Sequence, residues 1–425
     1  MKKRKGIIVQ KFGGSSVADP EKIKNVAKRI SATRRLGYDV VVVVSAPGDT
    51  TDDLLELAGA ITSYPAEREL DMLLSTGEQM SVALLAMALH ELKFEAISFT
   101  GAQVGIITDS SHTKAKILDV STDRIKRELG RGNIVIVAGF QGMNLNREIT
   151  TLGRGGSDMT AVALAKVLKA DMCEIYTDVK GVYTADPRLI KDARKLDTIS
   201  YEEMLELASL GAQVMQARSM EVAGKFNIPM HIRSSMHPDK GTIVTREEKE
   251  MEDVLVRGVT ANTKEAKVTV CDVPDKPGVA SRLFERLAKS DVNVDMIVQN
   301  VSRTGKTDIS FTVEKKDMDR SHEVVKNIAK QIGARDVKYD DNIAKVSVVG
   351  IGMRSHSGVA AAMFSALAAK KINIEMISTS EIKISCVVSR KNADIAVKTL
   401  HKAFALEKDP KKKRQGVSGK LFLNA

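Results

Sequence analysis

The chain has 425 residues, of which 43% are hydrophobic, 28% charged and 4% aromatic, and it contains no tryptophan. This length predicts two to three domains, each large enough to bury a core of its own. The composition is that of an ordinary globular protein, and it excludes a disordered, collagen-like or coiled-coil chain.

The net charge of the chain is +11 at pH 7, which raises the question of a nucleic-acid or membrane partner. Residues 2–5 are all Lys or Arg, and residues 407–420 hold six cations and two anions, which leaves a net charge of +3 for the rest. Basic tails of this kind are usually solvated, so we expect no nucleic-acid partner. Polyanion binding by the tails stays an alternative, and it predicts an affinity that falls steeply with salt.

The three cysteines, Cys173, Cys271 and Cys386, are scattered along apolar, strand-like runs and show no metal-binding spacing. No apolar stretch is expected to reach the length needed to span a bilayer, and the apolar run at residues 6–9 is too short for a signal peptide. We therefore expect a cytoplasmic protein with buried, reduced cysteines, no zinc site and no membrane partner.

Up to about residue 235, short β-branched runs alternate with longer helical stretches, which is typical of a parallel sheet covered by helices. Asp19 followed by Pro20 predicts the start of the first helix, because Asp favours the N-cap and Pro the first helical position. The expected elements in chain order are strand 7–10, helix 20–36, strand 40–44, helices 52–63 and 71–92, strands 96–99 and 134–138, helix 157–168, strand 173–176 and helix 201–209. The chemistry is expected at the carboxyl ends of the strands.

A tandem repeat follows the polar stretch after residue 235. Its first copy contains Lys267, Gly278 and Asn293, which return 78 to 80 residues later as Lys345, Gly358 and Asn373. Each copy predicts a strand, a Gly-bearing loop, a helix, two strands (the second at 308–313 and 382–388) and a helix, a βαββα-type module. The loop before each helix presents backbone N–H groups that suit a small zwitterion or carboxylate, and a purely structural duplication is equally open.

The first motif with chemical meaning is Lys11-Phe12-Gly13-Gly14, directly after the first strand. Glycines let backbone amides approach an anion closely, and the lysine adds a compact positive charge. Taken alone, the motif also fits a simple tight turn, and it is not a Walker A loop, because the chain lacks that spacing.

The second motif is the loop 150–158, in which Arg154 stands among three glycines just before a predicted helix. An arginine in this place can hold a carboxylate through two hydrogen bonds, while backbone amides at the helix start hold a phosphate. The loop does not match the dinucleotide-binding spacing, and an arginine among glycines has little purpose in packing.

The third motif, at residues 176–188, mixes Asp, Thr, Tyr and Arg after a strand and suits a nucleoside with its phosphates and Mg²⁺, or else is a solvated loop. The three motifs together place several anion-binding groups and an acidic residue on an α/β fold that has no P-loop. That combination indicates phosphoryl transfer, in which positioning and charge neutralisation provide most of the catalysis.

These motifs, together with Ser45 after a valine-rich strand and Glu78 in Ser75-Thr76-Gly77-Glu78, resemble those of the aspartate kinases of the amino acid kinase superfamily. The repeat resembles the paired ACT domains of that family, and the resemblance covers about residues 6–405. It implies an α/β fold with an amino acid kinase-type α/β/α sandwich at 1–245, two ferredoxin-like ACT domains at 262–340 and 341–410, and a basic tail at 411–425. The single-function form, without an appended homoserine dehydrogenase, is expected.

The resemblance implies that ATP phosphorylates the β-carboxylate of L-aspartate to 4-phospho-L-aspartate, the first step toward lysine, threonine, methionine and isoleucine. The carboxylate is itself the nucleophile, and Mg²⁺ rides on the phosphates, so neither a strong general base nor a protein metal site is implied. By resemblance, the catalytic residues are Lys11, Arg154 and Asp158. The aspartate-binding residues are Ser45, Thr51, Glu78, Arg154, Gly155 and Gly156, and the ATP-binding residues are Lys11, Phe12, Gly13, Gly14, Ser157, Thr177, Asp178, Tyr183, Asp186 and Arg188.

The resemblance assigns four roles in particular. Lys11 neutralises charge on the transferring phosphoryl group, Asp158 orients Lys11, Glu78 holds the substrate ammonium and Arg154 holds a substrate carboxylate. It also implies feedback by lysine, threonine or both, bound between ACT domains, and a homo-oligomer, either dimer or tetramer, formed through these domains. The candidate effector residues are Asp275, Gly278, Val279, Asn293, Val294, Asp295, Gln299, Asn373, Ile374, Thr379, Ser380 and Glu381.

Two positions depart from the family pattern. Gln213 stands where many relatives have a lysine that reaches the nucleotide, and Ser357 stands where relatives often have proline. Two other interpretations stay open: a kinase of the same fold that uses another amino acid such as glutamate, and an amino-acid sensor whose kinase half is inactive.

Overall fold

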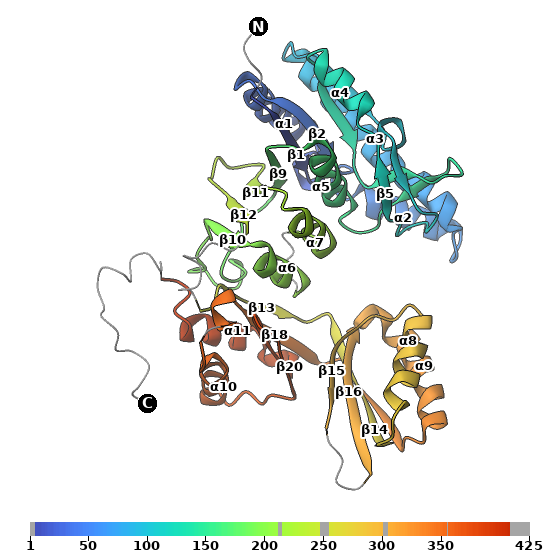
Figure 1. Ribbon diagram of the computed structural model, residues 1–425, viewed down its shortest axis with the longest axis vertical. Helices are drawn as coiled ribbons and strands as arrows, with labels where there is room; N and C mark the ends of the chain where they lie inside the picture. The colour runs from blue at the N-terminus through green and yellow to red at the C-terminus, as the bar shows by residue number, and fades with distance from the viewer. Residues whose placement is uncertain (1–4, 211–214, 247–254, 301–304, 355, 409–425) are drawn as a thin grey trace. The chain divides into compact units, whose positions relative to one another are not determined.

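The computed structural model describes residues 5–210, 215–246, 255–300, 305–354 and 356–408 (Figure 1). The chain divides into two compact units. The first unit comprises Met1–Val182, Lys195–Ser209 and Gln213–Glu247, and the second comprises Tyr183–Arg194, Leu210–Ala212 and Glu248–Ala425. Most of the basic tails predicted from the sequence, and Gln213, lie outside the described residues.

The first unit is built on an eight-stranded sheet of order β10-β12-β11-β9-β1-β2-β6-β3. The strands are β1 (Ile7–Phe12), β2 (Asp39–Val44), β3 (Ala96–Phe99), β6 (Ile134–Ala138), β9 (Met172–Thr177), β10 (Thr198–Ser200), β11 (Met230–Ser234) and β12 (Thr242–Thr245). All neighbours are parallel except the pair β11 and β12. The five strands predicted here are confirmed, and β1 lies between β2 and β9, so the end that carries Lys11 is in the middle of the sheet.

Helices cover both faces of this sheet. They are α1 (Pro20–Arg35), α2 (Thr50–Ile61), α3 (Glu67–Glu91), α4 (Asp123–Gly130), α5 (Gly156–Leu168), α6 (Tyr201–Ser209) and α7 (Ala217–Phe226), with 3-10 turns η1 (Gly14–Ser16) and η2 (Ala102–Val104). All predicted helices are confirmed. The carboxylate of Asp19 accepts a hydrogen bond from the Lys22 backbone N–H at 2.9 Å, as expected for an N-cap.

The central strands are buried on both sides. Val40, Val42 and Val44 of β2 pack with α1 and α3 in one hydrophobic cluster. Successive residues of a strand point to opposite faces, so the equally buried Val41 and Val43 point to the other face, where α5 contacts β1, β2 and β9. This explains why β2 is a continuous run of valines rather than an alternating pattern.

A second, small sheet in the first unit was not predicted. Its order is β5-β4-β7-β8, with β4 (Ile106–Thr108), β5 (Ile117–Val120), β7 (Gln141–Met143) and β8 (Ile149–Thr151). Each strand has only three or four residues, too few for a periodic pattern to show in the sequence. The last of them, β8, leads directly into the loop that carries Arg154.

The helix α3 corrects one expectation from the sequence. It has 25 residues and is long and apolar enough to cross a membrane by length and composition, which no stretch was expected to be. Half of its most apolar window is buried inside the fold, and a core helix of a globular domain passes the same test. It also carries buried Asp71, Ser75 and Glu78 on its inner face, so its length is weak evidence for a membrane.

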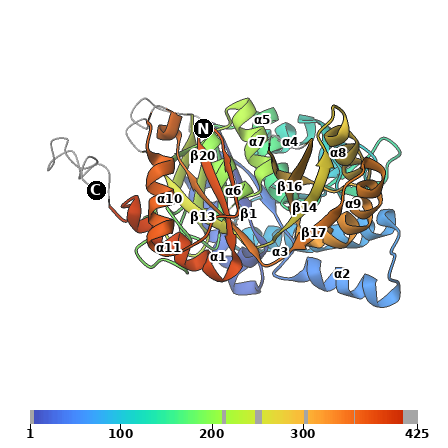
Figure 2. The same cartoon turned by 90° about the horizontal axis from the view of Figure 1, so that it is seen from below.

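The second unit contains two four-stranded antiparallel sheets, of order β15-β16-β14-β17 and β13-β18-β20-β19 (Figure 2). The strands are β13 (Gly258–Asn262), β14 (Glu265–Pro274), β15 (Val294–Gln299), β16 (Lys306–Glu314), β17 (Asp336–Asp340), β18 (Ile343–Val349), β19 (Met376–Thr379) and β20 (Lys383–Ser389). The helices are α8 (Val279–Lys289), α9 (Met318–Ile332), α10 (Val359–Ala369) and α11 (Ala393–Ala403), with 3-10 turns at Lys315–Asp317, Ile351–Arg354 and Arg390–Asn392. The predicted order of strand, helix, two strands and helix is confirmed in both copies.

One strand pairs with the copy that does not follow it directly in the chain. β13 precedes the first copy in the chain, yet it pairs antiparallel with β18 of the second copy, from Gly258 opposite Val349 to Asn262 opposite Lys345. The strand β17 that follows α9 pairs with β14 and completes the sheet of the first copy. The first copy is therefore inserted between the first strand of the second sheet and the rest of that sheet.

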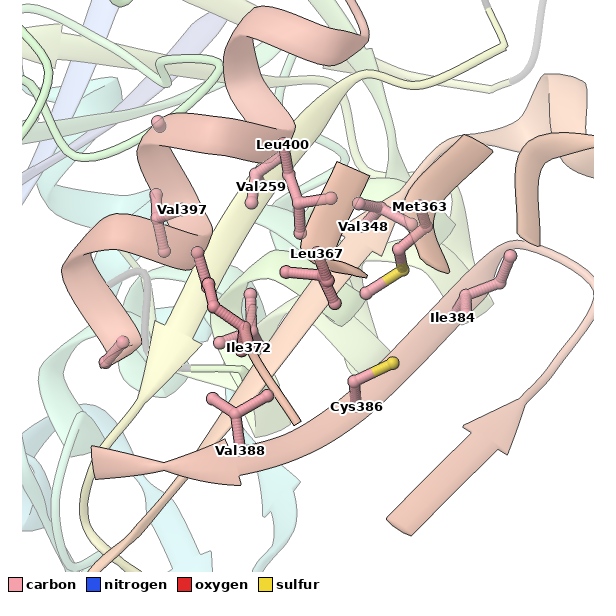
Figure 3. Packing of buried hydrophobic residues seen from close by; sticks show 14 of the residues in the cluster. Val259, Val348, Met363, Leu367, Ile372, Ile384, Cys386, Val388, Val397 and Leu400 are labelled. Atoms are coloured by element: carbon pink, nitrogen blue, oxygen red, sulfur yellow. The ribbon is translucent and has the colours of Figure 1, made fainter. Parts of the chain in front are cut away.

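Each sheet of the second unit has its own core. Figure 3 shows that of the β13-β18-β20-β19 sheet, where Val259 of β13, Val388 of β20, Leu367 of α10 and Leu400 of α11 pack together. The segment Tyr183–Arg194 adds Ala185 and Ile190 to the same cluster. The three cysteines lie in β9, β14 and β20, where they are buried and unpaired with one another, as predicted.

Candidate active site

The lysine at the end of β1 forms an ion pair with an aspartate on α5. The Lys11 Nζ atom lies 2.6 Å from Oδ1 of Asp158, and the two side chains are only 13% and 10% exposed. Asp158 is in the first turn of α5, where a carboxylate also benefits from the helix dipole. The sequence placed both residues in one site on resemblance, and the structure brings them into direct contact.

Backbone hydrogen bonds join the carboxyl ends of the neighbouring strands around Lys11. The Gly13 N–H donates to the Tyr176 carbonyl at 3.3 Å, the Ser45 N–H to the Phe12 carbonyl at 3.1 Å, and the Gly48 N–H to the Gly14 carbonyl at 3.0 Å. A Cβ on Gly14 would lie 2.7 Å from the Ala46 carbonyl oxygen, so only glycine fits there. The lysine-glycine motif therefore forms a closely packed turn next to Ser45.

The loop before α5 presents an arginine without an acidic partner. Gly155 is the N-cap residue of α5 in a left-handed conformation with φ 71°, and a Cβ there would collide with the side chain of Gln216. Arg154 is exposed and has no ion-pair partner in the part of the chain that the structure describes. A fixed helix start beside an unpaired guanidinium can hold an anion such as a carboxylate or a phosphate.

Glu78 is a buried carboxylate with one oxygen unused. Its Oε1 atom accepts a hydrogen bond from the Ala46 N–H at 3.0 Å, whereas Oε2 is buried without a hydrogen-bond partner among the described residues. Burial raises the pKa of Glu78 from 4.5 to about 7. A carboxylate in this state is prepared to receive a cation such as a substrate ammonium, which would favour its charged form.

The structure adds a buried polar cluster around Asp71 that the sequence analysis missed. Asp71 is fully buried and accepts hydrogen bonds from Thr151 Oγ1 at 2.5 Å, the Thr113 N–H at 3.0 Å and His112 Nδ1 at 2.8 Å. Thr151 is three residues before Arg154, so this cluster ties α3 to the arginine loop. Helical spacing is the feature of the sequence that could have revealed this cluster, because Asp71, Ser75 and Glu78 fall on the same face of α3 as its apolar residues.

The candidate nucleotide residues are divided between the two units. In the first unit, Thr177 Oγ1 donates to the Asp178 carboxylate at 2.9 Å just after β9, and Ser157 is buried in the first turn of α5. Tyr183, Asp186 and Arg188 lie in the segment Tyr183–Arg194, which packs within the second unit. There, hydrogen bonding with Arg188 lowers the pKa of the exposed Asp186, and the N–H of Arg188 donates to the Asp186 carboxylate at 2.8 Å.

Thr51, the remaining candidate for substrate binding, is half-buried in the first turn of α2, which follows Ser45 along the chain. Two hydrogen bonds hold α3 against the segment after β2. The Ala46 N–H donates to Glu78, and the Ser81 Oγ atom, one turn after Glu78, donates to the Ser45 carbonyl at 2.8 Å. The structure thus gathers Lys11, Ser45, Glu78 and Asp158 at the carboxyl edge of the sheet. Together with Arg154 on the loop before α5, this is a site with two cationic groups and two carboxylates, one of which, Asp158, is paired with Lys11. It suits an anionic substrate that also carries an ammonium.

Comparison with known proteins decides the family. The amino acid kinase family model matches residues 6–234, and the ACT domain model matches residues 271–327 and 346–404. An aspartokinase of Pseudomonas aeruginosa is 53% identical over 403 residues, which are 94% of this chain and 98% of the relative. The chain belongs to the aspartate kinases.

The aspartate kinase fold is shared with solved structures. Escherichia coli aspartokinase III in complex with aspartate and ADP matches with a TM-score of 0.80 and 26% identity over 93% of this chain and 99% of that one. The same enzyme in complex with lysine and aspartate matches with a TM-score of 0.72 and 25% identity over 94% and 99% of the chains. The amino acid kinase sandwich and the ACT domains that the sequence predicted are therefore both confirmed.

In this aspartate kinase, most of the candidate effector residues lie in or beside the edge strands β15 and β19 of the two ACT sheets, whereas Asp275, Gly278 and Val279 lie between β14 and the first turn of α8. β15 and β19 are in contact within the second unit, and Met296, Val298 and Met376 pack in one small cluster. The residues 291–300 and 371–380 have the same succession of exposed, intermediate and buried side chains. Gly278 and Gly358 are the left-handed N-cap residues of α8 and α10, with φ of 88° and 97°.

The individual effector candidates differ in their surroundings. Asp295 contacts Lys345, and its neighbour Val294 is half-buried in β15. The exposed candidates are Asp275, Gly278, Asn293, Asp295, Gln299, Asn373, Thr379, Ser380 and Glu381, while Val279 and Ile374 are partly buried. Ser357, which departs from the family pattern, is exposed just before Gly358.

Proposed function

We propose that this aspartate kinase transfers the γ-phosphoryl group of ATP to the β-carboxylate of L-aspartate and releases 4-phospho-L-aspartate and ADP. The observation that carries the proposal is the ion pair between Lys11 and Asp158 at the start of α5, next to the unpaired Arg154. The structure of the Escherichia coli relative with aspartate and ADP supports the same pair of ligands. The product places the reaction at the first step toward lysine, threonine, methionine and isoleucine.

Lys11 acts on the charge that spreads over the phosphoryl oxygens during transfer. Its ammonium is held by Asp158 before the substrates meet, so little reorganisation is needed when negative charge develops. The substrate β-carboxylate is ionised at neutral pH, attacks the γ-phosphorus, and displaces the ADP oxygen as that bond breaks. No group has to remove a proton, which fits a site whose charged side chains are all assigned to binding or orientation.

The aspartate is proposed to bind between α3 and the loop before α5. Glu78 Oε2, which has no hydrogen-bond partner among the described residues, accepts the substrate ammonium, and Arg154 holds a substrate carboxylate. Ser45 and Thr51 complete the pocket, and Gly155 and Gly156 let backbone amides approach the ligand. The burial of Glu78 strengthens its attraction to the ammonium, because the pair is shielded from water.

The nucleotide is proposed to lie over the turn after β1 and the loop after β9. Phe12, Gly13, Gly14, Ser157, Thr177 and Asp178 belong to these segments of the first unit, and Tyr183, Asp186 and Arg188 follow in the chain. Mg²⁺, carried by the ATP phosphates, supplies additional charge neutralisation when bound. Within the described residues there is no group of three or more His, Cys, Asp or Glu side chains placed to hold a metal ion, and the proposal needs none.

A hydroxylamine trap tests the reaction directly. An acyl phosphate reacts with hydroxylamine to give a hydroxamate, so the full chain with MgATP and aspartate is expected to yield aspartyl hydroxamate, and none with glutamate. A hydroxamate from glutamate alone would establish the related kinase instead. No turnover with either amino acid would establish an amino-acid sensor with an inactive kinase half.

Feedback regulation by lysine, threonine or both through the ACT domains is part of the proposal. It is supported by the ACT matches and by the structure of the Escherichia coli relative with lysine and aspartate. The steady-state assay repeated with lysine, threonine and the mixture distinguishes single from concerted inhibition. Unchanged velocity in all three conditions would contradict the regulatory role.

The remaining proposals concern organisation and location. We propose a cytoplasmic homo-oligomer, dimer or tetramer, assembled through ACT domains at 262–340 and 341–410, with a catalytic domain at 1–245 and a basic tail at 411–425. β13 (Gly258–Asn262) precedes the first of these ACT bounds and pairs with the second ACT sheet. Light scattering of the full chain and of a variant shortened after residue 410 tests the oligomer and the role of the tail.

A further inference from the structure

The helix α3 carries two buried carboxylates, and the proposed reaction uses only one of them. Asp71 and Glu78 are 0% and 2% exposed and lie on the inner face of the helix, two turns or about 10 Å apart along its axis. Glu78 is proposed to bind the substrate ammonium, whereas Asp71 has no role in that reaction. Burying a carboxylate is unfavourable unless hydrogen bonds compensate it, so the partners of Asp71 indicate its function.

Asp71 attaches the end of β8 to α3. Thr151, the last residue of β8, is fully buried, and its Oγ1 atom donates to Asp71 Oδ1 at 2.5 Å. The same carboxylate accepts a hydrogen bond from the Thr113 N–H at 3.0 Å, and the Thr151 carbonyl accepts one from the Ala115 N–H at 2.9 Å. Hydrogen bonds to a carboxylate are stronger than those between neutral groups, so this is a firm attachment for the strand that leads to Arg154.

The hairpin of β7 and β8 is attached to α3 at a second point. Gln141 of β7 lies opposite Thr151 in the register of the pair, and its Nε2 atom donates to the Ser75 carbonyl at 2.9 Å. Gln141 is 2% exposed, and Ser75 lies one turn after Asp71 on α3. Two attachments on successive turns of one helix fix the orientation of the hairpin as well as its position.

The two residues between β8 and Arg154 are also closely held. Leu152 is 2% exposed, its N–H donates to the Phe140 carbonyl at 2.8 Å, and its carbonyl accepts from Arg218 Nη1 at 3.3 Å. Gly153 has a positive φ of 75°, and a Cβ there would lie 3.0 Å from a backbone carbonyl oxygen. A shift at the end of β8 is therefore passed on to Arg154 rather than absorbed on the way.

From these contacts we infer that Asp71 and Thr151 are positioning residues for aspartate binding. The helix α3 holds the substrate ammonium directly, through Glu78, and a substrate carboxylate indirectly, through Asp71, Thr151 and Arg154. Because both binding groups are fixed to one helix, their separation is set before the substrate binds, and such preorganisation strengthens binding. The inference rests on the proposed function, since it requires Glu78 and Arg154 to bind aspartate.

Thr151→Val tests the inference, because it removes the hydroxyl and keeps the shape of the side chain. The steady-state KM for aspartate should rise about tenfold, while kcat and the KM for ATP change less than about threefold, as expected when only the binding of one substrate is weakened. Thr151→Ser keeps the hydroxyl and should restore a KM near the wild-type value. An unchanged KM for aspartate in Thr151→Val would overturn the inference.

Thr108→Val is the matched control for a general disturbance of the small sheet. Thr108 of β4 is 1% exposed, and its Oγ1 atom shares a hydrogen bond of 2.6 Å with Thr150 Oγ1, next to Thr151 in β8. The control therefore removes a buried hydroxyl contact of β8 that does not involve α3, and it should change the KM for aspartate less than about twofold. An equal rise of this KM in Thr108→Val and Thr151→Val would show that the hydroxyl of Thr151 is merely structural.

A double-mutant cycle tests whether Thr151 acts through Arg154. Thr151→Val should lower kcat/KM for aspartate about tenfold in the wild type but less than about twofold in Arg154→Ala, because the group that it positions is then absent. Equal factors in the two backgrounds would overturn the inference and leave the proposed function intact. A wild-type chain that forms no aspartyl hydroxamate would contradict the proposed function itself.

Discussion

Lys345 of β18 donates a hydrogen bond to Asp295 of β15, and this contact has a counterpart between Lys267 of β14 and Glu375 just before β19. The internal repeat relates the two contacts, because Lys345 is the equivalent of Lys267 and Glu375 is the equivalent of Asp295. Each ACT copy therefore supplies the cation of one ion pair and the anion of the other. The copies are joined reciprocally, as the halves of a two-fold symmetric pair would be.

The two ion pairs differ in burial, so we expect them to contribute differently to the free energy of unfolding. The side chains of Lys345 and Glu265, its second partner, are 3% and 5% exposed. Burial alone would lower the pKa of Lys345, but the carboxylates of Glu265 and Asp295 outweigh burial and raise it. Replacing Lys345 by methionine leaves Glu265 buried without a cation, so the free energy of unfolding measured in urea should fall by about 3–5 kcal/mol.

The equivalent substitution in the other copy is the control. Lys267 and Glu375 are 20% and 24% exposed, so Lys267→Met should cost only about 1 kcal/mol. Adding Glu265→Gln to Lys345→Met should recover part of the loss, because the uncompensated charge is removed. Equal losses for the two lysines would show that burial does not set these energies.

Lys11→Ala is expected to lower kcat by about 10²–10³ or more, the scale for losing one preorganised donor in a transition state. The steady-state assay measures this effect, with Lys24→Ala as the control, since Lys24 is an exposed lysine paired with Glu21 on α1. Asp158→Asn should give a smaller loss than Lys11→Ala, because it leaves the ammonium present but unoriented. A wild-type kcat for Lys11→Ala would remove Lys11 from the mechanism.

The raised pKa of Glu78 predicts a pH dependence for both stability and activity. Its carboxyl group, with a pKa of about 7 in the folded protein and 4.5 in the reference state, binds a proton more tightly when folded. The stabilisation is complete below about pH 4.5 and is lost as the pH rises through about 7. In the free enzyme at higher pH, Glu78→Gln should therefore be more stable than the wild type by up to about 3 kcal/mol.

Activity should show the opposite trend, because the substrate ammonium needs the ionised form of Glu78. The ratio kcat/KM for aspartate is expected to rise about tenfold per pH unit below pH 7 and to level off above it. Glu78→Gln should lower the ratio and abolish this inflection, whereas Glu69→Gln, an exposed change on the same helix, should keep it. An unchanged inflection in Glu78→Gln would assign the pKa to another group.

Gln299→Ala is expected to weaken inhibition by the amino-acid effector while the kcat without effector stays near the wild-type value. Gln299 is exposed at the end of β15, beside the contact with β19, and its removal leaves no buried partner unsatisfied. The concentration of lysine or threonine that gives half-inhibition measures the effect, with the exposed Gln331→Ala of α9 as the control. Parallel losses of kcat and inhibition would indicate a structural role.

The fold of the first unit could be predicted where local signals were strong. Asp19 and Pro20 predicted the start of α1, and the valine run predicted β2, because each pattern depends on a few neighbouring residues. The small sheet that supports the arginine loop was missed, since its strands are too short for a periodic pattern, and its two halves are joined by one contact between Ile107 and Met143, far apart in the chain. The Asp71 cluster was missed for a similar reason: its partners lie about 40 and 80 residues away.

The candidate site could be assembled only through resemblance. Residue types around Lys11 and Arg154 indicated anion binding, but no spacing in the sequence reveals that Lys11 meets Asp158 across 147 positions. The ion pair results from the parallel sheet, which places the end of β1 above the start of α5. The pairing of β13 with β18 is equally invisible locally, because β13 looks like the start of the copy that follows it.

Because of the position of β13, removing the first ACT copy and removing the second would have different consequences. Excision of residues 265–340 would leave Asn262 at the end of β13 and Ile343 at the start of β18, ready to be rejoined by a short loop as an ordinary hairpin. Truncation after residue 340 would instead strip β13 of its partner and expose an apolar edge that includes Val259. A gene that loses one copy can therefore lose the first cleanly, while loss of the second leaves an unpaired strand prone to aggregation.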